Sequence, residues 1–123
     1  MLRTQDTFVV LVDLQEKLAR VMHERQKLID NTARLLKGCR VLGVPVVWTE
    51  QNPAGLGKTV PEVADLLEGE PITKLSFSCW REARFREAVE RLGRGNAVLA
   101  GIETHVCVYQ TAVDLVETGM EVQ

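Results

Sequence analysis

The chain has 123 residues, of which 46% are hydrophobic and 26% charged, and its formal net charge is −2. This length is enough for one domain with a real core, so we predict a single domain over residues 1–123. The near-balance of charge argues against nucleic acid as the main partner, because no basic excess is available to neutralise phosphates. A membrane-spanning helix is not expected, because no apolar stretch approaches the roughly 20 residues it needs.

The cysteine content and the N-terminal stretch predict a cytoplasmic protein. Three cysteines at wide spacing do not make a disulfide framework. The N-terminal sequence MLRTQDTFVVLVDLQ has an early Asp, and its apolar run ends at Asp13, so it is typical of a first strand rather than a signal peptide.

The first half of the chain predicts two strands with a helix between them. Residues 8–12 (FVVLV) form a continuous apolar run, typical of a strand buried on both faces. Residues 44–49 predict a second buried strand, residues 51–61 a loop rich in Gly and Pro, and residues 62–67 a short helix. Between the strands, apolar residues at spacings of four and three predict a helix, and Gly43 suits its C-terminal cap. The predicted inward positions of this helix are Leu28, Thr32, Leu35, Cys39 and Leu42.

The second half continues the alternation of strand and helix. Residues 71–74 predict a weak strand, residues 96–100 a fourth strand, and residues 120–123 the beginning of a fifth. A helix over about 80–92, capped near Ser78, precedes the fourth strand, and a helix over about 104–117 follows it. The inward positions of these helices are Phe85, Ala88, Val89 and Leu92 in the first, and Val108, Thr111, Ala112 and Leu115 in the second.

This alternation predicts an α/β sandwich with a parallel sheet and right-handed crossovers. The sequence ends inside the fifth predicted strand. We therefore expect that a closing strand and helix are missing at the C-terminus.

Polar residues follow the predicted strands where each of them ends. Asp13 ends the first strand, Glu50 the second and Lys74 the third, while the turn after Gly101 delivers Cys107 to the start of a helix. In an open parallel sheet, ligands bind outside the carboxyl ends of the strands. The sequence therefore predicts an acid, a cation and a nucleophile at one edge of the sheet.

These three residue types suit nucleophilic catalysis. A cysteine near a helix N-terminus is expected to have a lowered pKa, and the same free amides can hold an oxyanion. Asp13 is placed to take the proton of the Cys107 thiol and pass it to a leaving group. Lys74 is placed to stabilise the thiolate and to orient Asp13.

Each residue alone also has a structural interpretation. Cys107 alone could be a small buried hydrophobe, Asp13 a cap after the first strand, and Lys74 a solvated lysine. His105 is a poor general base for the thiol, because positions two apart in a helix point about 200° apart. We assign the remaining cysteines and histidine to structure: Cys39 to the core, Cys79 to packing or the border of a pocket, and His23 to the surface.

No metal or nucleotide cofactor is expected. Zinc needs three or four ligands at close quarters, and two distant histidines without a paired-cysteine motif do not supply them. A dinucleotide fingerprint needs glycines directly after the first strand, and here residues 13–17 are DLQEK. Gly55 and Gly57 do not have the spacing of a phosphate loop.

Three motifs resemble the isochorismatase-like cysteine hydrolase superfamily in order and spacing. They are residues 12–18 (VDLQEKL), 73–78 (TKLSFS) and 101–112 (GIETHVCVYQTA). Residues 49–57 (TEQNPAGLG) are similar to the small isochorismatase-domain branch, whose members mostly lack an assigned substrate.

The resemblance implies a three-layer α/β/α fold of the Rossmann-like type. It implies a triad of Asp13, Lys74 and the nucleophile Cys107. It also implies a non-proline cis peptide at Ile102–Glu103, which turns the Glu103 amide toward the Cys107 amide to form an oxyanion hole. Nicotinamidases of this family carry metal-binding histidines after the second strand, and their absence here argues against a metal and against nicotinamidase activity.

The leading hypothesis is a metal-independent cysteine hydrolase that cleaves a C–N bond in a small amide or related carbonyl compound through a thioester. Leu18, Trp48, Phe77 and Tyr109 are candidate pocket walls, with core packing as the alternative for each. The alternative function is a catalytically silent binding or redox-sensing module. The family tendency and the edges of so small a sheet suggest a homo-oligomer.

Overall fold

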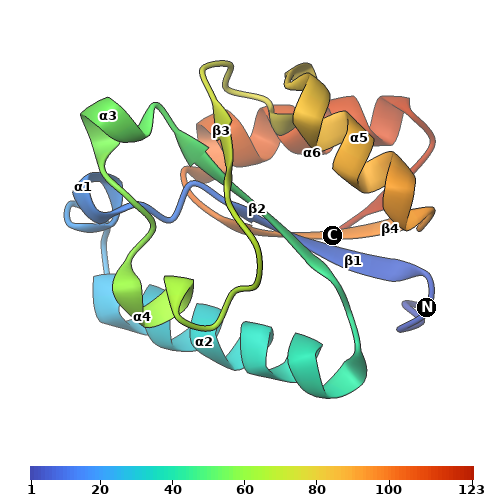
Figure 1. Cartoon of the computed structure of the whole chain (residues 1–123), viewed down its shortest axis with the longest axis horizontal. Coiled ribbons are helices and arrows are strands. Elements are labelled where there is room, and N and C mark those ends of the chain that lie inside the picture. Colours follow the sequence, from blue (N-terminus) through green and yellow to red (C-terminus); the bar gives the residue numbers. More distant parts are fainter.

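The computed structural model describes residues 1–123 as a five-stranded, all-parallel sheet with helices on both faces (Figure 1). The strand order is β3-β2-β1-β4-β5. The strands are β1 Thr7–Val12, β2 Val46–Gln51, β3 Ile72–Lys74, β4 Asn96–Gly101 and β5 Glu121–Val122. The helices are α1 Glu16–Ala19, α2 Arg25–Leu42, α3 Pro53–Leu56, α4 Pro61–Ala64, α5 Ala83–Leu92 and α6 Tyr109–Glu117.

Strand β1 is the centre of the sheet. All six of its residues are buried, as the continuous apolar run predicts. Val10 lies in register with Val47 of β2 on one side and with Leu99 of β4 on the other. The parallel α/β class expected from the alternating elements is therefore confirmed.

The two faces of the sheet carry separate hydrophobic cores. In Figure 1, α2 covers one face, and α5 and α6 cover the other. Phe8 and Val10 pack with Phe85 of α5 on the α5–α6 side, whereas Leu11 packs with Ile29 of α2 on the opposite side. The result is the three-layer arrangement that the resemblance implies.

Helix α2 is turned slightly from the predicted orientation. Thr32 and Cys39 are buried as expected, but Leu42 is exposed and Leu35 is only half-buried. Two neighbouring stripes of side chains run along this helix, and Thr32 and Cys39 belong to both. The predicted stripe adds Leu35 and Leu42, whereas the stripe that is buried adds Ile29 and Leu36. The predicted inward positions Leu35 and Leu42 were therefore wrong, because hydrophobic spacing alone does not choose between adjacent stripes.

Several helix boundaries also differ from the prediction. The predicted helix over 80–92 is two pieces, a 3₁₀ turn Cys79–Arg81 and helix α5, separated by extended backbone at Glu82. Ser78 caps the first piece, because its hydroxyl accepts a hydrogen bond from the Trp80 amide at 3.2 Å. The predicted helix over 62–67 is shorter, and the predicted loop over 51–61 contains the single turn α3.

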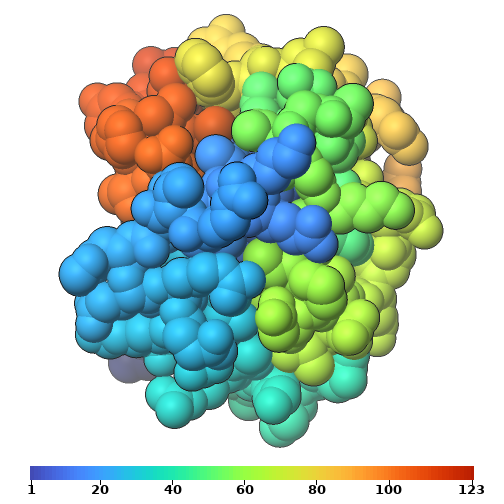
Figure 2. Space-filling model, turned by 90° about the vertical axis from the view of Figure 1, so that its left-hand side faces the viewer, coloured from blue at the N-terminus to red at the C-terminus, as the bar shows by residue number.

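The carboxyl ends of the strands meet at the left of Figure 1, and Figure 2 looks onto this edge. There the blue N-terminal segment lies between the orange segment of the last helix and the green to yellow segments from the middle of the chain. Residues from three distant parts of the sequence are thus gathered at one edge. No helix of the protein has the length and apolar character needed to cross a membrane.

Candidate active site

The end of strand β4 is held tightly against the end of β1. Gly101 has φ +122°, and a Cβ at this position would collide with the backbone of Val12. The Ile102 amide donates to the Val12 carbonyl at 3.0 Å, and the Ile102–Glu103 peptide bond is cis. A glycine is therefore required where the chain turns from β4 toward Cys107, and the turn lies directly beside Asp13.

Asp13 is a fully buried carboxylate in a left-handed backbone conformation, with φ 46°. Its Oδ1 accepts a hydrogen bond from the Thr49 hydroxyl at 2.8 Å. Its Oδ2 lies 2.9 Å from Lys74 Nζ, yet no hydrogen bond of proper geometry reaches that oxygen. Oδ2 is thus held by charge alone and keeps its capacity to accept a proton.

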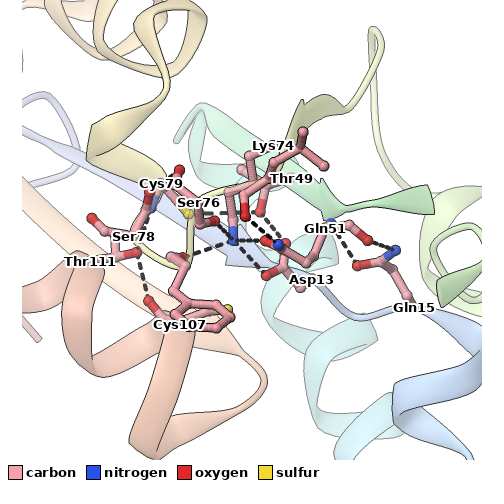
Figure 3. Close-up of polar contacts among 12 residues, drawn as sticks. Asp13, Gln15, Thr49, Gln51, Lys74, Ser76, Ser78, Cys79, Cys107 and Thr111 are labelled. Atoms are coloured by element: carbon pink, nitrogen blue, oxygen red, sulfur yellow. Dashed lines mark hydrogen bonds and ion pairs between the residues drawn. The ribbon is translucent and has the colours of Figure 1, made fainter. Parts of the chain in front are cut away.

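The protons of Lys74 explain why Oδ2 lacks a donor. Nζ donates to Gln51 Oε1 at 2.7 Å, to the Phe77 carbonyl at 2.8 Å and to the Ser76 carbonyl at 3.0 Å (Figure 3). An ammonium group has only three protons, and these three acceptors use them. Lys74 therefore gives Asp13 its charge, while its hydrogen bonds fix the ammonium group in place.

Cys107 lies in the turn that leads into α6. Residues Thr104–Val108 form a π-helical turn before α6 begins, so the single helix predicted over 104–117 is two segments. Thr111 connects this turn to the loop after β3, because its hydroxyl donates to the Cys107 carbonyl at 2.7 Å and accepts from the Cys79 amide at 2.9 Å. The nucleophile candidate is thereby fixed to a second element of the site.

The Cys107 thiol does not have the lowered pKa that its place at a helix start predicts. Its pKa is raised from 9.0 to about 11, chiefly because the thiol is buried; the Asp13 carboxylate also raises this pKa, and the Lys74 charge lowers it. The cost of desolvating a thiolate is larger than the help from the nearby cation. The expected lowering of the Cys107 pKa was therefore wrong, and a pKa of about 11 leaves the thiol protonated near pH 7.

One backbone amide at this turn is free. The Glu103 amide donates to no group in the protein, and Glu103 is half-buried. This N–H belongs to the cis Ile102–Glu103 peptide bond itself, directly before the turn that carries Cys107. A free amide in this position is able to donate a hydrogen bond to a bound ligand.

Three polar residues of the site have no role in the sequence prediction. Thr49 binds Asp13, Gln51 binds Lys74, and Gln15 is fully buried and hydrogen-bonded to the backbone of Gln51. Thr49 and Gln51 lie in the second half of strand β2, and Gln15 lies three residues after the end of β1, yet Thr49 and Gln15 are buried. That placement was the available signal, because buried polar side chains need partners.

Of the four candidate pocket walls, Trp48 is misplaced. It packs in the core on the α2 side of the sheet, and its indole N–H donates to the Glu68 carbonyl at 3.1 Å. Neighbouring residues of a strand point to opposite faces, so Thr49 faces the site and Trp48 faces away. Leu18 is half-buried against the same α2-side core.

Phe77 and Tyr109 are 55% and 62% exposed. Phe77 adjoins the site directly, since its carbonyl accepts from Lys74. Tyr109 follows Cys107 by two residues at the start of α6.

The other singled-out residues have structural positions. Glu50 binds the backbone amide and the hydroxyl of Thr59, so it anchors the loop after β2. Cys39 is buried in the core, as predicted, and His105 is exposed while Cys107 is buried. Cys79 is fully buried with Sγ 3.7 Å from Thr49 Oγ1, and burial raises its pKa.

No group of three or more His, Cys, Asp or Glu side chains is gathered closely enough to hold a metal ion. The charged centre of the site is one buried Asp–Lys pair with a neutral thiol beside it. A carboxylate, an ammonium group and a thiol are thus gathered at one edge of the sheet.

The parallel sheet, its flanking helices and the residues at its carboxyl edge define a hydrolase-type α/β fold. The sequence model of the isochorismatase domain matches residues 7–123, and the chain belongs to the isochorismatase domain family. The membership expected from the three motifs is confirmed.

Known proteins extend this comparison. Isochorismatase domain-containing protein 2 of Danio rerio is 42% identical over 98% of this chain and 61% of its own length. The structure of MAR1 ribonuclease from Caenorhabditis elegans has a TM-score of 0.89 and 36% identity, over 98% of this chain and 62% of its own. The YcaC gene product of Escherichia coli, described as an octameric hydrolase of unknown specificity, has a TM-score of 0.92 and 28% identity over the same shares. The chain thus spans about three fifths of these relatives.

Proposed function

We propose that the protein is a metal-independent cysteine hydrolase that cleaves the C–N bond of a small amide or related carbonyl compound. One observation supports this most strongly. Asp13 Oδ2 is a buried carboxylate oxygen without a hydrogen-bond donor, in a site where the neutral Cys107 thiol needs a base. A structural carboxylate would be expected to have both oxygens satisfied.

In the first half of the proposed reaction, Cys107 Sγ attacks the carbonyl carbon while its proton passes to Asp13 Oδ2. A thiol that stays neutral until attack needs this transfer, since the nucleophile is the thiolate. The carbonyl oxygen becomes an oxyanion, and the amides of Glu103 and Cys107 donate hydrogen bonds to it. Lys74 keeps a positive charge beside Asp13 throughout.

In the second half, the intermediate collapses and the C–N bond breaks. Asp13 returns its proton to the leaving nitrogen, so the amine departs neutral and a thioester remains on Cys107. Water then attacks the thioester, with Asp13 taking a proton from it, and the acid is released as Sγ regains its proton. Atoms and charges balance, and no cofactor enters.

The substrate class follows from the surroundings of the site. Phe77 presents exposed aromatic surface next to it, which suits a small molecule with an apolar part. One structural relative is described as a ribonuclease. We favour a small carbonyl compound over RNA, because a net charge of −2 supplies little attraction for a phosphate backbone.

The test is a turnover screen of small amides, carbamoyl and ureido compounds, with release of ammonia or amine as the readout. We expect at least one compound to be hydrolysed by the wild type and not by Cys107→Ala. Cys39→Ala, a buried cysteine in the core, is the matched control and should keep the activity. A single-stranded RNA is included, and Cys107-dependent cleavage of RNA without amide hydrolysis would overturn the proposal.

We also propose that the protein is a homo-oligomer. Tyr109, Val113 and Val116 form an exposed apolar stripe along α6, at spacings of four and three. The octameric relative shows that this fold supports self-association in at least one protein. Size-exclusion chromatography with light scattering tests this, and a monomer at all concentrations would contradict it.

A further inference from the structure

A buried glutamine is hydrogen-bonded across the ends of two strands at this site. Gln15 is fully buried, and its side chain makes three hydrogen bonds. Oε1 accepts from the Gln51 amide at 2.7 Å, and Nε2 donates to the Gln51 carbonyl at 2.9 Å and to the Gly57 carbonyl at 2.7 Å. The side chain of Gln15 thus binds both backbone groups of one residue.

These hydrogen bonds of Gln15 take the place of backbone pairing with β1, which ends before it reaches Gln51. The β1–β2 pairing extends from Val9↔Val46 to Leu11↔Trp48, and β1 then turns away at Asp13. The Gln51 backbone, at the end of β2, has no β1 residue in register with it. The carboxamide of Gln15 supplies one acceptor and one donor, as a neighbouring strand does.

The hydrogen bonds continue from Gln51 to Lys74. Gln51 lies in register with Lys74 on β3, and its Oε1 accepts from Lys74 Nζ at 2.7 Å. Its Nε2 donates to the Leu75 carbonyl at 2.8 Å, which fixes the orientation of the amide. Gln51 is therefore fixed by its backbone on one side and by its side chain on the other (Figure 3).

We propose that Gln15 and Gln51 are positioning residues, which act through Lys74 to set the geometry of Asp13 and Cys107. This inference rests on the proposed function. Both side chains are neutral amides, and this matters in a buried site. A carboxylate at Gln51 would compete with Asp13 for the ammonium group, whereas an amide oxygen binds one Lys74 proton without adding a charge.

The test uses Gln51→Leu, which removes the side-chain bond to Lys74 and leaves the backbone bonds to Gln15 intact. The first readout needs no substrate: the rate at which iodoacetamide labels Cys107, followed by peptide mass spectrometry from neutral to alkaline pH. Asp13 and Lys74 are the charged groups that act on this thiol. Since the Lys74 charge assists the thiolate, a loosened Lys74 should move the labelling profile to higher pH.

The second readout is turnover of a compound found in the amide screen. Gln51→Leu should lower kcat about tenfold or more with KM unchanged, because small misplacements of catalytic groups cost rate rather than binding. Gln15→Glu should have the same signature, because a carboxylate cannot donate to the carbonyls of Gln51 and Gly57. Gln26→Leu is the matched control, because Gln26 is an exposed glutamine that binds only Asp30 of its own helix.

A double-mutant cycle identifies the route of the effect. In a Lys74→Met background, Gln51→Leu should produce no further shift in the labelling profile, since Gln51 acts through Lys74. An equal shift in both backgrounds would overturn the proposal, as would an unchanged kcat and labelling profile in folded Gln51→Leu.

These results are distinguishable from failure of the proposed function. If Asp13→Asn and Cys107→Ala abolish turnover while Gln51→Leu has no effect, only the positioning roles are wrong. If Cys107→Ala keeps full turnover, the proposed function itself is wrong. Thermal unfolding of each variant shows whether a loss of rate comes from loss of the fold.

Discussion

The protein contains two Asp-centred ion pairs that differ sharply in their surroundings. Asp13 and Lys74 meet at 2.9 Å with both side chains fully buried. Asp114 and Arg81 also meet at 2.9 Å, but the Arg81 side chain is 67% exposed and the Asp114 side chain 10%. The first pair lies at the carboxyl edge of the sheet, and the second joins α6 to the loop after β3.

The difference lies in how completely each carboxylate is satisfied. Asp114 accepts from the Ser78 hydroxyl and from two nitrogens of Arg81, which together hold its pKa below its usual range. Asp13 has one oxygen without any hydrogen-bond donor, although it is the more deeply buried. The Arg81–Asp114 pair is thus fully hydrogen-bonded, whereas the Asp13–Lys74 pair keeps one carboxylate oxygen free, as the proposed role of Asp13 as a base requires.

The largest expected effect is the loss of one buried charge. Lys74→Met should lower the free energy of unfolding by about 3–5 kcal/mol, because it leaves the Asp13 carboxylate buried without a counter-charge. Urea denaturation measures this. Replacing both residues, as Asp13→Leu with Lys74→Met, should recover much of the loss. If Lys74→Met alone were as stable as the wild type, the result would contradict the burial of this ion pair.

The next largest expected effect distinguishes the proposed role of Asp13 as a base from that of Cys107 as a nucleophile. Asp13→Asn should lower kcat by about 10²–10⁴, the usual contribution of a general base. The same change should speed iodoacetamide labelling of Cys107, because the Asp13 charge raises the pKa of that thiol. Asp114→Asn is the control on the other pair and should change neither rate. Slower labelling in Asp13→Asn would contradict the arrangement of charges.

The neutral thiol beside the buried pair predicts a loss of stability at alkaline pH. The folded pKa of Cys107, about 11, lies above its ordinary value of 9.0. As pH rises, the Cys107 thiol therefore loses its proton in the unfolded chain before it does so in the folded protein. The contribution of the buried thiol to the free energy of unfolding is complete below pH 9.0 and is lost as pH rises toward 11. The expected loss is about 2–3 kcal/mol. The free energy of unfolding of the wild type and of Cys107→Ala, measured between pH 8 and 11, isolates this loss. If both proteins lose the same stability over this range, the prediction is wrong.

The smallest expected effect is on the Arg81–Asp114 pair, in which only the arginine is exposed. Arg81→Ala should lower the free energy of unfolding by about 0.5–1 kcal/mol, since an exposed partner is screened by water. Because the pKa of Asp114 is lowered in the fold, this contribution is present above the unfolded pKa of an aspartate and is lost as pH falls through the folded value. Unfolding of the wild type and of Arg81→Ala at neutral and at acid pH measures the size of this contribution and its pH dependence. If the loss of stability in Arg81→Ala grew on acidification, it would contradict this account of the pair.

The sequence predicts much of the fold because its apolar patterns are strong. The run over 8–12 defines the central strand, and the residues after three strands predict which side chains share an edge. The inward face of α2 is only partly predicted by the sequence, because Thr32 and Cys39 belong to two adjacent apolar stripes of this helix.

Features that depend on tertiary surroundings were not predictable in the same way. The pKa of Cys107 depends on how much water the fold removes from the thiol, and helix position alone gave the wrong direction. The contacts of Gln15 join positions 36 and 42 residues away in the sequence, so no local pattern reveals them. Trp48 is a candidate pocket wall from the sequence, but the alternation of side chains along β2 turns it to the other face of the sheet.

The central claim is that Cys107 attacks a carbonyl carbon, and rapid acid quenching during turnover tests it most directly. Intact-protein and peptide mass spectrometry should show a mass increase equal to the acyl part of the substrate, without its amine, on the peptide that contains Cys107. Cys107→Ala should show neither the adduct nor turnover. Hydrolysis that continues at the wild-type rate in Cys107→Ala would contradict the account.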